Sequence, residues 1–138
     1  MKLALVTTTI NVPTVLKLYR QLAGPDVHFF IIGDRKSPSQ EITEFLQTVP
    51  HCTYYSIDHQ YALGFKCARL IPEDCIQRRN IGFLAALRWG ADVVYSWDDD
   101  NLPISSGFFG CLLDPLYTQF NGIQVSGYNN WFDPGSLL

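Results

Sequence analysis

The chain has 138 residues, which is enough for one domain around a single hydrophobic core. Apolar residues make up 47% of it and charged residues 17%, a composition that excludes a disordered protein. The net charge of −3 provides no basic field for nucleic acid or for an anionic membrane, so we expect a cation as partner and no nucleic acid.

The N-terminal sequence and the spacing of the cysteines indicate the cellular compartment of the protein. The opening MKLALVTTTI has one lysine and a short apolar run, but not the long apolar region and cleavage site of a signal peptide. No apolar run approaches the ~20 residues of a membrane span. The four cysteines, Cys52, Cys67, Cys75 and Cys111, include no C-x-x-C pair, and their spacing resembles neither a zinc site nor a disulfide framework. We therefore expect a cytoplasmic protein with reduced thiols and no membrane span.

In the first part of the chain, strand and helix patterns alternate. Continuous apolar runs rich in β-branched residues predict strands buried on both faces, whereas apolar residues at helical spacing predict helices. These patterns predict a strand at 2–10, a helix at 12–24, a strand at 27–34, a helix at 39–48 and a strand at 52–58. The second helix is expected to take its N-cap from Ser37 or Ser39.

The next part begins with a less regular stretch at 59–73. A helix is predicted to follow at 74–90, with Asp74 as its N-cap and Gly90 just past its end. Its buried face is expected to consist of Ile76, Phe83, Leu84 and Leu87. Residues 91–97 then predict the strand that leads into three consecutive aspartates.

This alternation predicts an α/β domain with a mainly parallel sheet flanked by helices. In such sheets, ligands bind at the carboxyl ends of the strands, near a reversal of strand order. Polar segments follow three of the predicted strands: Thr7–Asn11, Asp34 and Asp98–Asn101. Because parallel strands end at the same edge of a sheet, we expect these segments to lie close together.

The three aspartates at 98–100 repel one another, at a cost that rises as water is excluded. In an extended segment alternate side chains point the same way, so Asp98 and Asp100 are expected to share one face and Asp99 to point elsewhere. A divalent cation between Asp98, Asp100 and a diphosphate removes the repulsion, and Mg²⁺ and Mn²⁺ both suit oxygen ligands. The alternative is a solvated acidic turn, which the apolar strand in front disfavours.

The sequence Gln-Arg-Arg-Asn at 77–80 is a second polar group, early on the predicted helix before this strand. Arg78 and Arg79 point about 100° apart around an α-helix, so one can face a ligand while the other reaches solvent or a surface carboxylate. A fixed guanidinium near the metal can hold phosphate oxygens or a carboxylate. The alternative is that both arginines are solvated.

The stretch RRNIGFLAALRWGADVVYSWDDDN resembles the part of GT-A glycosyltransferases where an R-N-x-G helix leads into an acidic D-x-D strand. Together with IGD after the second strand, it is most similar to the reversibly glycosylated polypeptide and UDP-arabinopyranose mutase group. The resemblance spans about residues 2–101. It implies a GT-A (Rossmann-like) fold and a nucleotide-diphospho-sugar site.

The resemblance assigns roles to the matching positions. It implies that Mn²⁺ or Mg²⁺ is held on the diphosphate by Asp98 and Asp100. The nucleotide-sugar contacts that it implies come from strand ends and from the arginine helix: Thr7, Thr8, Thr9, Asp34, Arg78, Arg79, Asn80 and Asp99. Asp34 matches the acidic residue that accepts the N3–H of uracil, a donor that cytosine lacks, so a UDP-linked sugar is expected.

The chain is predicted to be a single domain, with a nucleotide-binding core at 2–101 and a partial acceptor-side region at 102–138, as in a truncated or minimal GT-A fold. The expected reaction is glycosyl transfer to an acceptor that the sequence does not identify. Alternatives are a UDP-sugar pyranose/furanose mutase, a non-catalytic nucleotide-sugar-binding module and a nucleotidyltransferase. Against the last, no Gly-rich phosphate loop follows the first strand. The sequence indicates neither a catalytic base nor an oligomeric state.

Overall fold

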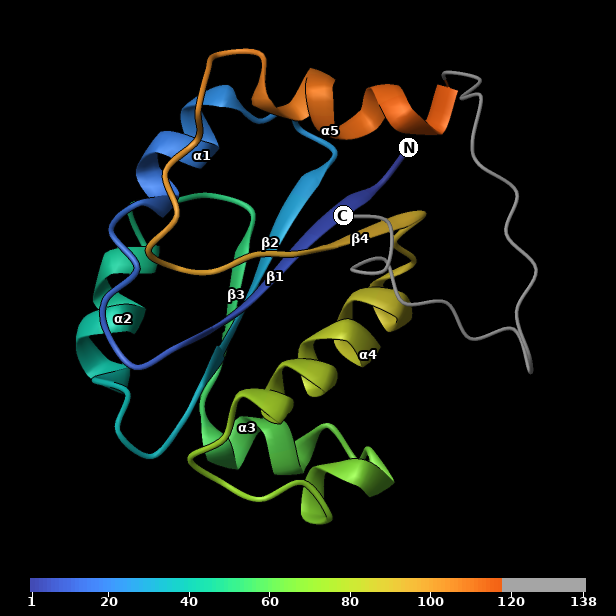
Figure 1. Cartoon of the computed structure of the whole chain (residues 1–138). Helices are drawn as coiled ribbons and strands as arrows, with labels where there is room; N and C mark the ends of the chain where they lie inside the picture. The colour runs from blue at the N-terminus through green and yellow to red at the C-terminus, as the bar shows by residue number, and fades with distance from the viewer. Residues whose placement is uncertain (118–138) are drawn as a thin grey trace, which may run out of the picture.

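The computed structural model describes residues 1–117, in which four strands form one parallel sheet (Figure 1). The strands are β1 (Leu3–Thr9), β2 (Val27–Gly33), β3 (Cys52–Tyr55) and β4 (Val93–Ser96). Most of the predicted acceptor-side region, residues 118–138, lies outside the described residues. The predicted α/β class, with a parallel sheet between helices, is confirmed and is compatible with a Rossmann-like fold.

The order of the strands across the sheet is β3-β2-β1-β4. From β1 the chain moves outward to β2 and β3, and it then returns to the other side of β1 to form β4. Leu3 of β1 is therefore paired with Val27 on one side and with Val93 on the other. This reversal creates a switch point between the carboxyl ends of β1 and β4, which is where open α/β sheets bind ligands.

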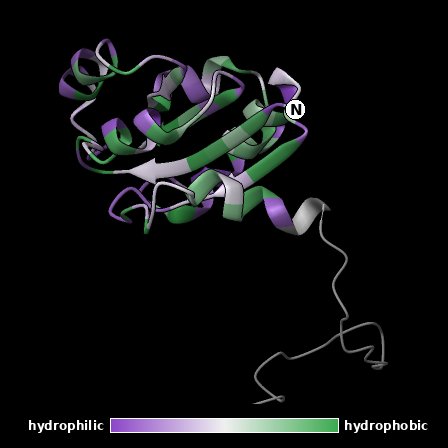
Figure 2. Cartoon of the chain, turned by 90° about the horizontal axis from the view of Figure 1, so that it is seen from above, coloured by the Kyte–Doolittle hydropathy of each residue, from purple (hydrophilic) through white to green (hydrophobic). Residues whose placement is uncertain are grey.

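Helices cover both faces of the sheet. The helical segments are α1 (Leu16–Leu22), α2 (Ser39–Leu46), α3 (Ile57–Ala62), the 3-10 turns η1 (Lys66–Arg69) and η2 (Ile76–Arg78), α4 (Arg79–Trp89) and α5 (Phe108–Tyr117). On one face α1, α2 and α5 pack around Leu5 and Phe29, and on the other α4 packs on Val6 and Phe30. Figure 2 shows mainly hydrophobic strands, with hydrophilic segments gathered in the surrounding loops and helices.

The two central strands are buried on both faces, as their unbroken apolar runs predict. Side chains of residues 3–6 and 29–32 are at most 2% exposed. The helices on either face remove this surface from water, and its burial is the main stabilising contribution to the fold. The strands predicted at 2–10, 27–34 and 91–97 are therefore confirmed, with small differences at their ends.

Two predictions about local boundaries are wrong. The third strand ends at Tyr55 and not at residue 58, because the Ser56 hydroxyl accepts a hydrogen bond from the backbone N–H of His59 and begins α3. Neither Ser37 nor Ser39 caps α2, whose N-cap position is occupied by Pro38. The Ser37 hydroxyl instead donates to the Thr9 carbonyl over 2.6 Å, which ties this loop to the end of β1.

The helix predicted at 74–90 begins five residues later, at Arg79. Asp74 is not its N-cap and has a positive φ of 54°, whereas Gly90 ends the helix with φ 88° as predicted. The predicted buried face is wrong for Ile76 and Leu87, which are 61% and 59% exposed, whereas Phe83 and Leu84 are half-buried. The buried residues of α4 are Ile81, Gly82, Ala85 and Ala86. Three of these four residues are small, and small side chains on this face let the helix backbone approach the sheet closely.

His28 of β2 is packed against aromatic rings near the N-terminal end of the sheet. Its ring centroid lies 4.8 Å from that of Phe30 and 5.2 Å from that of Trp89, and its Nε2 is 2.8 Å from the Thr53 hydroxyl oxygen. Burial lowers the pKa of His28 to about 4, and the positive charges of His51 and Arg20 act in the same direction. The imidazole is therefore neutral in the folded protein at pH 7.

We expect this histidine to make the protein less stable in mild acid. In the unfolded chain its pKa is 6.5, so between about pH 6.5 and 4 the unfolded state binds the proton more readily. Between pH 7 and pH 5 this lowers the free energy of unfolding by about 1–2 kcal/mol, and below about pH 4 the group adds nothing more. Urea denaturation at both pH values should show a smaller loss in His28→Gln than in the wild type. His59→Gln, at an exposed position, is the control; equal losses in all three proteins contradict the prediction.

Among residues 1–117, no helix combines the length and the apolar composition needed to cross a membrane. All four cysteines are free thiols, as expected. Burial raises the pKa of the Cys52 thiol to about 12, so this cysteine is protonated and unreactive at neutral pH.

Candidate functional site

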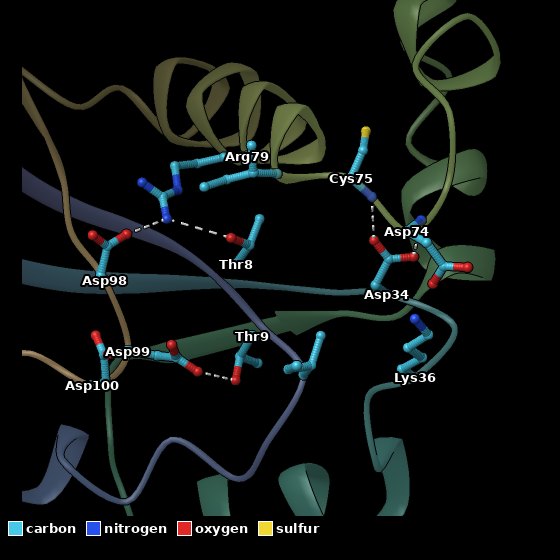
Figure 3. A pocket seen from close by; sticks show the side chains of 12 residues that line it. Thr8, Thr9, Asp34, Lys36, Asp74, Cys75, Arg79, Asp98, Asp99 and Asp100 are labelled. Carbon is cyan, nitrogen blue, oxygen red and sulfur yellow. Dashed lines mark hydrogen bonds and ion pairs between the residues drawn. The ribbon is translucent and has the colours of Figure 1, made fainter.

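The carboxyl ends of β1, β2 and β4 border a cavity of about 500 Å³ (Figure 3). It is lined by Thr8, Thr9, Ile10, Asp34, Lys36, Asp74, Cys75, Ile76, Arg79, Asp98, Asp99 and Asp100. The polar segments after the three strands thus meet at one edge of the sheet, as the strand-end argument predicts. The cavity includes the switch point between β1 and β4.

Seven of the ten residues singled out in the sequence line this cavity, and three do not. Thr7 is buried within β1, and its hydroxyl donates to the carbonyl of Thr8. Asn80 is exposed on α4, and Arg78 is completely buried away from the cavity. Of the two adjacent arginines, Arg79 is therefore the one that faces the site.

Arg79 crosses from the first turn of α4 to the ends of two strands. Its Nη2 lies 2.5 Å from the Asp98 Oδ1, and its Nη1 donates to the Ser96 hydroxyl over 3.0 Å. A longer contact of 3.4 Å joins Nη2 to the Thr8 hydroxyl. Figure 3 shows the guanidinium between Asp98 and Thr8. These contacts hold a positive charge at the switch point, on the wall of the cavity.

The three aspartates do not continue the extended strand. Asp98 and Asn101 are the ends of a turn, in which the backbone N–H of Asn101 donates to the Asp98 carbonyl over 3.1 Å. The expected alternation is therefore wrong, and all three carboxylates line the cavity. Asp98 pairs with Arg79, while Asp99 accepts a hydrogen bond from the Thr9 hydroxyl. Among the residues described, no hydrogen bond or ion pair engages the Asp100 carboxylate.

Asp34 fixes the wall of the cavity on the β2 side, opposite Arg79 and the three aspartates. Its Oδ1 accepts from the backbone N–H groups of Arg35 and Asp74, over 2.8 and 2.7 Å, and its Oδ2 accepts from that of Cys75 over 3.2 Å. The left-handed conformation of Asp74, which aspartate tolerates better than most residues, accompanies this arrangement. A carboxylate offers about four acceptor sites, so Oδ2 retains capacity for a ligand donor.

The buried Arg78 supports this wall from behind. Its Nε donates to the Gln60 side-chain carbonyl over 2.7 Å, and its Nη1 donates to the Ile71 carbonyl over 3.0 Å. The Gln60 amide in turn donates to the carbonyls of Gly33 and Tyr55, over 2.7 and 2.8 Å. This chain of contacts ties the ends of β2 and β3 to the loop before η2. Gln60 was not singled out in the sequence, because nothing local marks an amide that joins such distant segments.

Five aspartates and two cations, Lys36 and Arg79, line the cavity. This excess of negative charge favours a cation, or an anion that arrives together with one, over a bare polyanion. Ile10 lies in the segment Thr7–Asn11 that was expected at this edge. Sequence reasoning missed four lining residues, Lys36, Asp74, Cys75 and Ile76, and it placed the last three in a helix. The contacts of Asp34 and Arg35 with residues 73–75, some 40 positions along the chain, bring that loop to the site.

The donor set suits a hard divalent cation only in part. Within residues 1–117, no three His, Cys, Asp or Glu side chains are grouped closely enough to hold a metal ion by themselves. Asp98 and Asp100 both open onto the cavity and supply the carboxylate oxygens that Mg²⁺ and Mn²⁺ prefer. Mg²⁺ commonly uses one or two carboxylates together with water and substrate phosphates, and these residues fit that arrangement.

No protein-family model matches the sequence, and the search of curated proteins finds no match.

Proposed function

We propose that this domain binds a UDP-linked sugar together with a divalent cation and acts as a metal-dependent glycosyltransferase of the GT-A type. The observation that carries the proposal is the meeting of Arg79 and three aspartates at the switch point of a parallel sheet. A cavity of about 500 Å³ at that point is within the usual range for small-molecule sites, which is about 300–1,000 Å³.

The residues divide into two groups along the cavity. On the β1–β4 side, Asp98 and Asp100 would hold Mn²⁺ or Mg²⁺, which supplies Lewis-acid stabilisation of the charge on a departing diphosphate. Arg79 adds a fixed positive charge beside these carboxylates, where it can bind phosphate oxygens. The hydroxyls of Thr8 and Thr9, at the end of β1, offer hydrogen bonds to the nucleoside.

On the β2 side, Asp34 is assigned to the uracil ring. Its carboxylate is held rigidly by three backbone N–H groups, and its remaining acceptor capacity matches the N3–H donor of uracil. The nearby side chain of Ile76 is 61% exposed and offers an apolar surface for the ring. This assignment favours UDP over a cytidine nucleotide, because the cytosine ring lacks a donor at N3.

The test is calorimetric titration of UDP into the protein, with Mn²⁺ and then with EDTA. We expect binding that needs the metal and that is weakened roughly 100-fold in Asp98→Asn/Asp100→Asn, a loss of about 2.7 kcal/mol. Asp26→Asn/Asp58→Asn removes the same charge from two exposed aspartates away from the cavity and should bind UDP as the wild type does. Failure of the wild type to bind UDP under either condition overturns the proposal.

A second measurement separates transfer from its alternatives. Incubation of the protein with Mn²⁺ and UDP-sugars, followed by analysis of the free UDP and of the sugar ring form, should show UDP release for a glycosyltransferase. Interconversion of ring forms without UDP release indicates a mutase, and binding without either reaction indicates a non-catalytic module. Both of those outcomes contradict the proposed transfer.

A further inference from the structure

We infer that Arg79 competes with the divalent cation for the Asp98 carboxylate, so that the metal ion binds weakly alone and tightly together with a diphosphate. The inference rests on the proposed function and goes beyond it, because it adds the exchange of partners at Arg79 to the coupling that direct contact of the metal ion with the diphosphate provides. The diphosphate provides Arg79 with a replacement partner and thereby releases Asp98 to the metal ion.

The first support is the unequal exposure of the two partners. The Arg79 side chain is 15% exposed, whereas that of Asp98 is 56% exposed. A metal ion can therefore approach Asp98 from the cavity, whereas the Arg79 side chain is mostly shielded from water and loses its one charged partner within residues 1–117 when the metal ion takes this carboxylate. A largely buried charge that loses its partner is strongly destabilised. Binding of the metal ion alone carries this cost.

The second support is the scarcity of other partners for the guanidinium. Its Nε is already buried without a hydrogen-bond partner among the described residues. Its other contacts, with Ser96 and Thr8, are to neutral hydroxyls. Asp99 is engaged by Thr9 and is not paired with Arg79. Only an incoming anion can replace the charge of Asp98, and phosphate oxygens are well suited to a guanidinium.

The third support is that the guanidinium is already in position for an anion in the cavity. The hydroxyls of Ser96 and Thr8 belong to the ends of β4 and β1, and they hold Arg79 between these two strands. Figure 3 shows the guanidinium directed toward the aspartates from the α4 side. The exchange therefore requires a change of partner and no movement of the helix.

The remaining carboxylates explain why free metal binds weakly. Asp98 is paired with Arg79, Asp99 accepts one hydrogen bond from the Thr9 hydroxyl, and Asp100 makes no such contact among the described residues. While Asp98 is neutralised by Arg79, the remaining carboxylate oxygens and water form a weak site for Mn²⁺ or Mg²⁺. By linkage, a ligand that strengthens metal binding is itself bound more tightly by the same factor when the metal is present. Coupling between two ligand sites commonly amounts to about 5–150-fold.

The experiment measures Mn²⁺ affinity by electron paramagnetic resonance of the free ion, with and without UDP. In the wild type, we expect UDP to raise Mn²⁺ affinity about 10–100-fold. In Arg79→Gln we expect Mn²⁺ alone to bind about 10-fold more tightly than in the wild type, and UDP, whose phosphates still ligate the ion, to raise its affinity by a factor about 10-fold smaller than in the wild type. Arg88→Gln, the same substitution at the other end of α4, should behave as the wild type does.

A double substitution shows whether the effect passes through Asp98. In the Asp98→Asn background, Arg79→Gln should no longer strengthen the binding of Mn²⁺ alone, because the contested carboxylate is absent. Thermal unfolding of each protein checks that it is folded, and Arg79→Met replaces Arg79→Gln if the glutamine variant unfolds.

The outcomes separate this inference from the proposed function. If the wild type binds Mn²⁺ and UDP together but Arg79→Gln binds free Mn²⁺ no more tightly, the competition is refuted and the nucleotide site stands. If the wild type binds no UDP with or without Mn²⁺, the proposed function fails, and the inference fails with it.

Discussion

Gly82→Ala is expected to lower the free energy of unfolding by about 2 kcal/mol, although alanine favours a helix more than glycine does. A Cβ at this position would lie 2.4 Å from the Val6 Cγ1 and 2.8 Å from the Ile32 Cγ1. Both neighbours are fully buried on the central strands, so neither can move aside easily. The methyl group must push α4 away from the sheet.

The matched control is Gly110→Ala in α5, where nothing lies within 4 Å of the added Cβ. We expect this variant to be more stable by up to about 1 kcal/mol, through helix propensity alone. Urea denaturation of both variants measures the contrast. Equal stability of Gly82→Ala and the wild type would show that α4 does not approach the sheet as closely as described.

We expect Gly82→Ala to affect the candidate site as well. Arg79 lies three residues before Gly82 on α4, so displacement of the helix moves the guanidinium away from Asp98 and Ser96. We therefore expect Gly82→Ala to weaken metal-dependent UDP binding as well, whereas Gly110→Ala should leave it unchanged.

Gln60→Leu is expected to lower the free energy of unfolding by about 3 kcal/mol. The Gln60 side chain is completely buried and makes three hydrogen bonds, to Arg78 and to the carbonyls of Gly33 and Tyr55. Leucine fills similar space but leaves these groups unsatisfied, and each orphaned buried group costs about 1–3 kcal/mol. The guanidinium of Arg78 matters most, because its charge remains buried.

Two further proteins complete the experiment. Gln40→Leu makes the same change at an exposed position of α2 and should alter stability by less than about 0.5 kcal/mol. Arg78→Met should destabilise the protein less in the Gln60→Leu background than in the wild type, because the two residues share one hydrogen bond. Additive effects of Gln60→Leu and Arg78→Met would refute a shared network.

The parts of the fold that could be predicted are those that depend on local pattern. Residues 3–6 and 29–32 are apolar at every position, and such a run has few uses other than a strand covered on both faces. Gly90 ends α4 because its left-handed backbone conformation is open to glycine. Since parallel strands end at a common edge, the polar residues after β1, β2 and β4 could be placed together without any knowledge of their contacts.

The selection of Arg79 over Arg78 could not be predicted in this way. Both arginines are adjacent, and a helical pattern shows only that they point in different directions. Arg78 is drawn inward by Gln60 and the Ile71 carbonyl, and Arg79 by Ser96 and Asp98. These partners are 7 to 19 residues away along the chain. These partners come close to the two arginines only when the sheet and the helices have packed together.

Hydrophobic pattern and strand ends in the sequence therefore specify the central strands, the edge of the sheet that carries the site, and the aspartates on it. Packing specifies the rest: the start of α4, the turn at 98–101 and the loop held by Asp34. The physical reason is that burial of an apolar run is encoded residue by residue, whereas hydrogen bonds of buried polar groups depend on which distant segments meet.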